Sequence, residues 1–149
     1  MFTDIVGYTS LMGKDEDQAF SLLRKNLRLQ RSIIRKYNGH FLKEIGDGIL
    51  ASFPLASDAV RCAKAIQTSV SAEGYELTIG IHTGEMVFEK ADAWGDSVNV
   101  ASRIQEQGET GRILISGTVY KDIKNQKEFK VNFLDERKLK NVDEPVKIY

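Results

Sequence analysis

Cysteine, net charge and long apolar runs are what this 149-residue sequence most clearly lacks. A single cysteine, Cys62, excludes an internal disulfide and a cysteine-based zinc site, and it fits a reducing, cytoplasmic setting. The 21 Lys and Arg residues balance the 21 Asp and Glu residues, so the overall charge favours neither a nucleic acid nor an anionic membrane as partner. No apolar run is long enough to cross a membrane, and we expect no signal peptide.

Two nucleotide-binding motifs are also missing. The sequence has neither the GxxxxGK[ST] phosphate loop nor the GxGxxG fingerprint. A nucleotide, if one binds, must therefore be held in another way.

The length and the 42% hydrophobic content predict one domain with a packed core. We expect a short helix near residues 5–11. Apolar residues with helical spacing predict further helices at 15–38, 55–72, 97–107 and 118–123. Alternating or short apolar runs predict strands at 1–4, 41–45, 49–53, 76–83, 85–89, 112–116, 129–134 and 146–149. This order predicts an α+β fold. We expect a ferredoxin-like split βαβ arrangement on an antiparallel sheet, with helices on one face and a C-terminal β extension. The basic residues of the helix at 15–38 have no aromatic residues among them, so we interpret them as a solvated face.

The stretch Lys43–Phe53 is predicted to form a β-hairpin at the centre of the sheet. Two apolar arms meet at Gly46-Asp47-Gly48, which is typical of a tight hairpin because glycine adopts positive φ at little cost. The turn places the Asp47 carboxylate at a rigid end of the sheet, with Lys43 four residues upstream. Taken alone, Asp47 is more simply a turn residue that bonds its own backbone.

Other polar residues are equally ambiguous by themselves. Asp4 lies where the first strand ends, and it suits either a hard cation or the N-cap of the following helix, while Gly7 permits close backbone approach. Asn99 and Arg103 are four residues apart and share one helix face, where they could bond each other or solvent. His82 has no second His or Cys at ligand spacing, so we interpret it as structural.

Three stretches in this order carry a family resemblance: Phe2–Thr9, Lys43–Gly48 and Trp94–Arg103. Together they resemble the catalytic domain of class III nucleotidyl cyclases, the adenylyl and guanylyl cyclases, across nearly the whole of residues 1–149. The segment Leu139–Val146 is similar to the closing segment of bacterial members, although Asn141 stands where that segment often has glycine. The resemblance implies a head-to-tail homodimer with two active sites at its interface.

Roles for individual residues follow from the resemblance. It implies that Asp4 and Asp47 bind two divalent cations, Mg²⁺ or Mn²⁺, with help from the Ile5 backbone carbonyl; carboxylate oxygens are suitable ligands for both ions. It also implies a cradle for the triphosphate, formed by the backbone of Val6, Gly7, Tyr8 and Thr9.

The same resemblance assigns the chemistry on the helix at 97–107. Asn99 is expected to orient the ribose, and Arg103 to stabilise charge on the transferring phosphoryl group, for which a planar, permanently charged guanidinium is well suited. The resemblance also implies that a basic residue of the C-terminal segment contacts the phosphates. We assign this role to Lys140, with Lys138 as the alternative.

Lys43 and Asp92 match the two positions that select the base in the family. A Lys donor and an Asp acceptor complement N1 and the N6 amino group of adenine, whereas guanine presents the reverse pattern. Guanylyl members typically carry Glu in place of this Lys. The expected activity is therefore adenylyl cyclase, converting ATP to 3′,5′-cyclic AMP and pyrophosphate. The alternatives are a catalytically silent cyclase-like nucleotide-binding or regulatory module, and a guanylyl cyclase.

The resemblance also bears on the parent protein. Domains of this family are commonly fused to sensory or membrane segments. We therefore expect residues 1–149 to be a cytoplasmic catalytic domain cut from a longer regulated chain, which a membrane segment could anchor.

Overall fold

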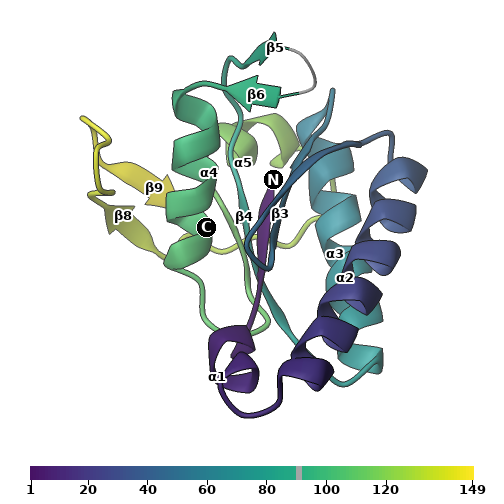
Figure 1. The fold of residues 1–149 in the computed structure, drawn as a ribbon. Helices are drawn as coiled ribbons and strands as arrows, with labels where there is room; N and C mark the ends of the chain where they lie inside the picture. Colours follow the sequence, from purple (N-terminus) through teal and green to yellow (C-terminus); the bar gives the residue numbers. More distant parts are fainter. Residues whose placement is uncertain (90–91) are drawn as a thin grey trace.

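The computed structural model describes residues 1–89 and 92–149, and side chains outside residues 88–94. Figure 1 shows its helices and strands in chain order. They are β1 Phe2–Ile5, α1 Tyr8–Met12, α2 Glu16–Lys36, β2 His40–Ile45, β3 Gly48–Ser52, α3 Ala56–Ala72, β4 Leu77–Ile81, β5 Val87–Glu89, β6 Asp92–Trp94, α4 Asp96–Glu106, β7 Ile113–Ile115, α5 Gly117–Ile123, β8 Asp135–Arg137 and β9 Val146–Ile148. None of the described helices is long and apolar enough to span a bilayer.

The main sheet has the strand order β2-β3-β1-β4-β7. Its first four strands are antiparallel to their neighbours, which is the predicted ferredoxin-like split βαβ arrangement. The fifth strand differs from the expected antiparallel sheet, because β7 runs parallel to β4. The α4 crossover between them makes this possible, since parallel neighbours need a long connection.

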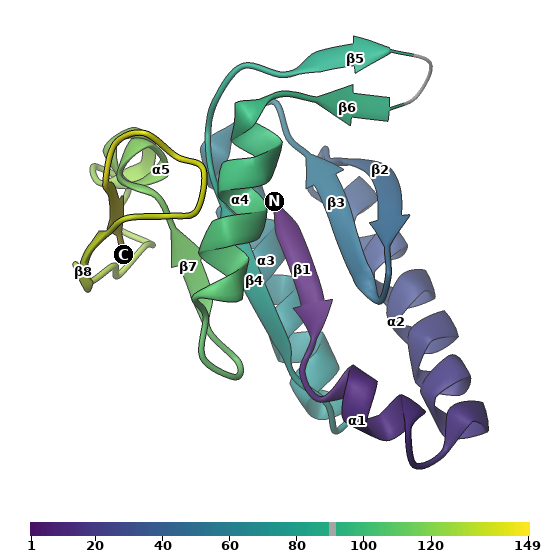
Figure 2. The same cartoon turned by 60° about the vertical axis from the view of Figure 1, so that its left-hand side comes forward.

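Helices cover both faces of the sheet, so the expectation of helices on one face is wrong in this detail. Helices α2 and α3 lie on one face, and α4 lies on the other (Figure 2). The sequence of β4 explains the difference. Leu77, Ile79 and Ile81 are buried in the cluster that includes α3 residues, whereas Gly80 turns to the opposite face, where α4 lies.

The structure differs from the prediction at 129–134 and adds detail at 85–89. Residues 129–134 are extended but belong to no described strand; the strand β8 follows them and pairs with β9. Phe129 and Val131 still pack against the core, so their alternation reflects side-chain burial without a backbone ladder. The strand predicted at 85–89 is β5, which pairs with β6 in a separate ribbon and not with β4.

Candidate active site

The β2–β3 hairpin places Asp47 at the end of the sheet, as predicted. Ile45 pairs with Gly48, which leaves Gly46 and Asp47 in the turn, and Gly46 has the positive φ of +63°. Gly48 serves another purpose. A Cβ atom there would lie only 2.7 Å from the Thr3 carbonyl oxygen, so the glycine lets β3 approach β1 closely.

This close approach brings two carboxylates together. Asp4, half-buried on β1, forms a hydrogen bond with Asp47, and the Ile5 backbone N–H donates to Asp47 Oδ2 at 3.1 Å. Burial raises the pKa of Asp4 to about 7, and the negative charge and hydrogen bond of Asp47 act in the same direction. Two carboxyl groups this close, with the pKa of Asp4 raised, make a site that favours positive charge between them.

The residues present fit a divalent cation at this position. Among the described residues, no group of three or more His, Cys, Asp or Glu side chains gathers to hold a metal ion. The residues that could hold a cation here are Asp4 and Asp47 with, as predicted, the backbone carbonyl of Ile5, and all three offer hard oxygen ligands. A cation here would relieve the repulsion that contributes to the raised pKa of Asp4.

The loop between β1 and α1 lies beside this pair. Gly7 has φ +76° and nothing within 4 Å of an added Cβ, so a ligand can approach its backbone. In the part of the chain that the structure describes, the backbone N–H groups of Gly7, Tyr8 and Thr9 have no backbone acceptor, whereas that of Val6 donates to the Glu76 carbonyl at 3.0 Å. Three residues of the predicted phosphate cradle thus offer a backbone N–H to a ligand, whereas the N–H of Val6 is already used.

A cavity joins the loop to the hairpin. It has a volume of about 480 Å³ and is lined by Tyr8, Thr9, Met12, Gly13, Gly46 and Asp47. The structure therefore brings Asp47, one of the predicted cation ligands, together with Tyr8 and Thr9, two of the four residues of the predicted phosphate cradle.

Helix α4 carries the second group of predicted residues on the same face of the sheet as Asp4. Asn99 is exposed, and the Arg103 guanidinium forms an ion pair with Glu106, which raises its pKa. The described contacts join neither Asn99 nor Arg103 to Asp4 or Asp47. Within one chain, no described hydrogen bond or ion pair thus joins the two groups of predicted residues.

The residues predicted to select the base lie on adjacent elements. Lys43 is half-buried on β2, and the ribbon containing β6 lies against β2 (Figure 2). Asp92 begins β6, but its side chain lies outside the described part of the structure.

The C-terminal lysines lie on a loop that is anchored to α4. Leu139 is buried against Val100 and Ile104 of that helix, while Lys138 and Lys140 on either side of it are exposed. Asn141 has φ +60°, the left-handed conformation that glycine also adopts, which accounts for Asn at this position.

Comparison with known proteins identifies the family. The family model described as the adenylate and guanylate cyclase catalytic domain matches residues 1–149. The chain belongs to this family. The cyclase domain is 31% identical to the Rhizobium meliloti (strain 1021) protein named "Putative adenylate cyclase 3" and 30% identical to the Anabaena cylindrica "Adenylate cyclase". These alignments cover 98% and 100% of this chain but 26% and 35% of the relatives, so the chain spans about a third or less of their length.

A solved structure supports the fold. The adenylate/guanylate cyclase/hydrolase from Silicibacter pomeroyi superposes with a TM-score of 0.83 at 32% identity, over 98% of this chain and 90% of that one.

One residue that positions the cyclase site was missed in the sequence. A Cβ atom at Gly80 would lie 2.4 Å from both the Ala101 carbonyl oxygen and the Gln105 backbone nitrogen, so only glycine lets α4 pack this closely on β4. The Gln105 amide also donates to the Thr78 hydroxyl at 2.5 Å. A glycine inside an alternating apolar strand was the available signal.

Proposed function

We propose that this domain is an adenylyl cyclase that converts ATP to 3′,5′-cyclic AMP and pyrophosphate at the interface of a homodimer. The observation that carries the proposal is the contact between Asp4 and Asp47 beside the open backbone of the α1 loop. This arrangement provides hard ligands next to hydrogen-bond donors, as a metal–triphosphate complex requires.

Each group has a distinct part in the reaction, in which the ribose 3′-OH attacks the α-phosphorus. Asp4, Asp47 and the Ile5 carbonyl would hold Mg²⁺ or Mn²⁺. The bound cations would supply Lewis-acid stabilisation of charge on the attacking and leaving oxygens. The N–H groups of the α1 loop would bind the phosphates.

Helix α4 would complete the site from the other chain. Arg103 would balance charge on the transferring phosphoryl group and Asn99 would orient the ribose, with Lys140 or Lys138 on the phosphates. Two facts support assembly from two chains. No described hydrogen bond or ion pair joins the two groups within one chain, and Val6 and Ile45, which lie near the Asp47 turn, are 39% and 43% exposed. Apolar residues exposed at the edge of a site are suited to burial by a partner.

The base preference rests on Lys43 and Asp92. The contact between β2 and β6 supports their joint action on one base, and the ammonium–carboxylate pattern complements adenine. The names of the bacterial and cyanobacterial relatives agree with an adenylate product. A guanylyl cyclase is the second candidate, and a silent nucleotide-binding module the third. The presence of Asp4, Asp47, Asn99 and Arg103 together argues against the silent module. The long relatives also support a regulated parent protein.

The direct test is incubation with ATP or GTP and Mn²⁺, followed by chromatographic separation of the products. We expect cyclic AMP as the main product. A dimeric preparation that forms no cyclic nucleotide would refute the proposal, and cyclic GMP as the main product would refute the base assignment.

The shared site has a separate test. Asp47→Ala and Asn99→Ala should each be inactive, and mixing them should restore part of the activity because one intact site forms per heterodimer. Heterodimers that are demonstrated by mass spectrometry yet remain inactive would refute the shared site.

A further inference from the structure

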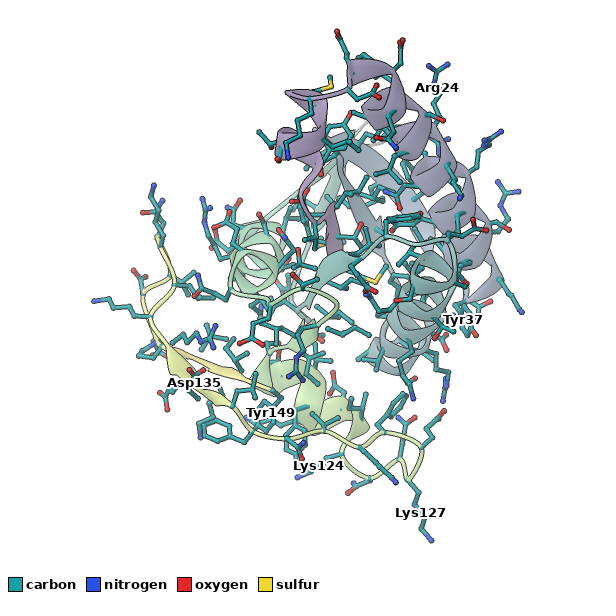
Figure 3. All side chains as sticks on the ribbon, turned by 90° about the horizontal axis from the view of Figure 1, so that it is seen from below. Arg24, Tyr37, Lys124, Lys127, Asp135 and Tyr149 are labelled. Atoms are coloured by element: carbon teal, nitrogen blue, oxygen red, sulfur yellow. The ribbon has the colours of Figure 1, made fainter. Side chains whose placement is uncertain are left out.

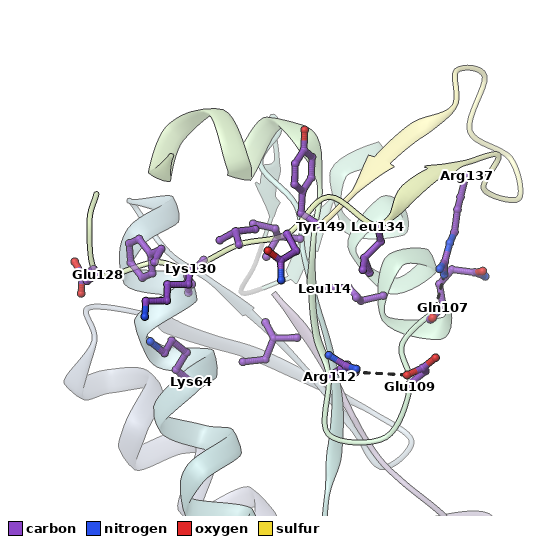
Figure 4. Close-up of a pocket in the computed structure, with 16 residues that line it drawn as sticks. Lys64, Gln107, Glu109, Arg112, Leu114, Glu128, Lys130, Leu134, Arg137 and Tyr149 are labelled. Carbon is purple, nitrogen blue, oxygen red and sulfur yellow. Dashed lines mark hydrogen bonds and ion pairs between the residues drawn. The ribbon is translucent and has the colours of Figure 1, made fainter. Parts of the chain in front are cut away.

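A second cavity lies at the opposite edge of the sheet from the Asp47 hairpin. It has a volume of about 690 Å³ and opens beside β7, the strand at the far end of the order β2-β3-β1-β4-β7 (Figure 4). Its walls come from α3, β7, the extended segment 128–134 and Tyr149. The volume falls within the range of small-molecule sites, roughly 300–1,000 Å³.

The cavity exposes an unused backbone edge. The Ile79 N–H donates to the Arg112 carbonyl and the Ser116 N–H to the Ile81 carbonyl, so even-numbered residues of β7 face β4 and odd-numbered ones face outward. The outward N–H and carbonyl of Ile115 form two backbone hydrogen bonds with Tyr149, both of 3.0 Å. Within residues 1–89 and 92–149, no backbone group forms a hydrogen bond with the outward N–H or carbonyl of Ile113. Segment 129–134, which lines the facing wall, does not pair with this edge.

The cavity is lined by an apolar wall and by charged side chains, of which more are cationic than anionic. Val60, Ile113, Phe129 and Leu134 provide apolar surface, and several charged residues line the same space. A ligand held here therefore needs an apolar body as well as a polar group.

Most of the charged side chains already have partners. Arg112 pairs with Glu109 at 3.7 Å, and Arg137 pairs with Asp135 at 2.8 Å. Arg61 holds the Glu128 carboxylate with hydrogen bonds of 2.6, 3.2 and 3.3 Å.

Two ammonium groups remain. Lys64 from α3 and Lys130 from the extended segment lie at the same end of the cavity as Glu128 (Figure 4). Among the described residues neither lysine has an ion-pair partner within 4.0 Å or a side-chain hydrogen bond. Lys64 is within electrostatic reach of Glu128, but that carboxylate is already bound by Arg61. Positive charge at this end exceeds the negative charge available to it.

We infer that this cavity binds a small organic carboxylate with an apolar or aromatic body. The carboxylate lies between Lys64 and Lys130, and the body lies against Phe129, Ile113 and Leu134. The outward N–H of Ile113 offers a further donor. The inference is independent of the cyclase activity, because it uses none of the residues assigned to that site.

The test is titration of the folded domain with 1-naphthaleneacetate, followed by calorimetry and by amide chemical shifts. We expect saturable binding with a Kd on the order of 1 mM or tighter, and shifts centred on Ile113 and segment 128–134. The neutral 1-naphthaleneacetamide has nearly the same shape, and it should bind at least tenfold more weakly.

Matched variants separate charge from folding. The double variant Lys64→Gln/Lys130→Gln should weaken binding of the carboxylate about tenfold and leave the amide unaffected. Lys124→Gln/Lys127→Gln removes the same charge from exposed residues outside the cavity, of which Lys127 extends away from the body of the molecule (Figure 3), and should bind like wild type. Equal affinity for carboxylate and amide, an unchanged Kd in the first double variant, or shifts centred on the Asp47 hairpin would each overturn the inference.

Discussion

Gly48 lets β3 lie close to β1, and replacing it with alanine tests how the carboxylate pair is built. The added Cβ would lie 2.7 Å from the Thr3 carbonyl oxygen, 3.1 Å from the Phe2 ring and 3.2 Å from Asp4 Oδ1. The nearest of these is backbone, which cannot rotate away as a side chain can. The strands must therefore separate. Overpacking of this kind costs about 1–3 kcal/mol of the free energy of unfolding.

The displacement would be transmitted to the site. Restoring an ordinary contact of 3.4 Å from 2.7 Å requires a movement of about 0.7 Å. Asp47 is the adjacent residue in the chain, so its carboxylate moves with β3 relative to Asp4 on β1. Misplacement by about 1 Å can cost on the order of 100-fold in rate. We therefore expect Gly48→Ala to lose about 10- to 100-fold in cyclase activity, well beyond its loss of stability.

Cation binding provides a measurement that does not need turnover. At a Mn²⁺ concentration of about 100 Kd the wild-type domain should gain about 2.7 kcal/mol of stability, measured as a rise in Tm. Gly48→Ala should gain less at the same concentration, because its carboxylates are displaced from one another.

Gly74→Ala is the matched control. Gly74 has φ +82° and open space around an added Cβ, so alanine there introduces only backbone strain of about 1–2 kcal/mol. It should lower Tm comparably and keep the full response to Mn²⁺. A Gly48→Ala variant that keeps the wild-type Mn²⁺ response and activity below its Tm would refute the argument that close approach of the strands builds the pair.

Two further predictions concern base choice and pH. Lys43→Glu should lower the ratio of kcat/KM for ATP over GTP by about 10- to 100-fold, since each mismatched buried polar group costs about 1–3 kcal/mol, and rates with the two nucleotides measure it. An unchanged ratio would remove Lys43 from base selection. For His82, whose Nδ1 lies 2.9 Å from the Ser116 hydroxyl, burial and then the Met1 ammonium charge lower the pKa. The unfolded chain therefore binds the proton more tightly, so stability is present above the ordinary His pKa of about 6.5 and is lost as pH falls below it. Because Asp4, with its raised pKa, contributes with the opposite sign over this range, the test is a difference: in urea unfolding from pH 7.5 to 5, His82→Gln should lose less stability than wild type, and His40→Gln, at an exposed residue, should follow wild type.

Local signals in the sequence were sufficient for most elements. The long helices follow their apolar periodicity, and Gly46 takes the positive φ that the hairpin required. The failure at residues 129–134 has a physical cause. Alternating apolar residues can bury their side chains without a paired backbone, and a sequence pattern reports only the burial.

Long-range contacts were less accessible to local reasoning. Asp4 on β1 and Asp47 in the β2–β3 turn are far apart in the sequence, and no local preference brings them together; only the family resemblance assigned both to one site in advance. The position of α4 on the second face depends on Gly80, where contact with the Ala101 carbonyl excludes any side chain. Its consequence is three-dimensional, because this contact fixes the position of the helix that carries Asn99 and Arg103 against β4.

The hairpin allows a test that separates a shared site from a self-contained one. If Lys43 and Asp47 serve opposite sites of a dimer, a heterodimer of Lys43→Glu with Asp47→Ala contains one site with every group intact. In that site, the first chain supplies Asp47 and the second supplies Lys43. Mixing the two variants should then restore ATP-selective activity that neither has alone, whereas the variant with both changes in one chain should give inactive homodimers.

The opposite arrangement predicts a different result for the same mixture. If both residues served the same site, the only site that keeps Asp47 would also carry the Lys43→Glu change. The mixture would then show the altered base selectivity of the Lys43→Glu variant, and no ATP-selective activity would return. The ATP-to-GTP ratio of the mixture therefore decides between the two arrangements, because total activity alone would be present in both.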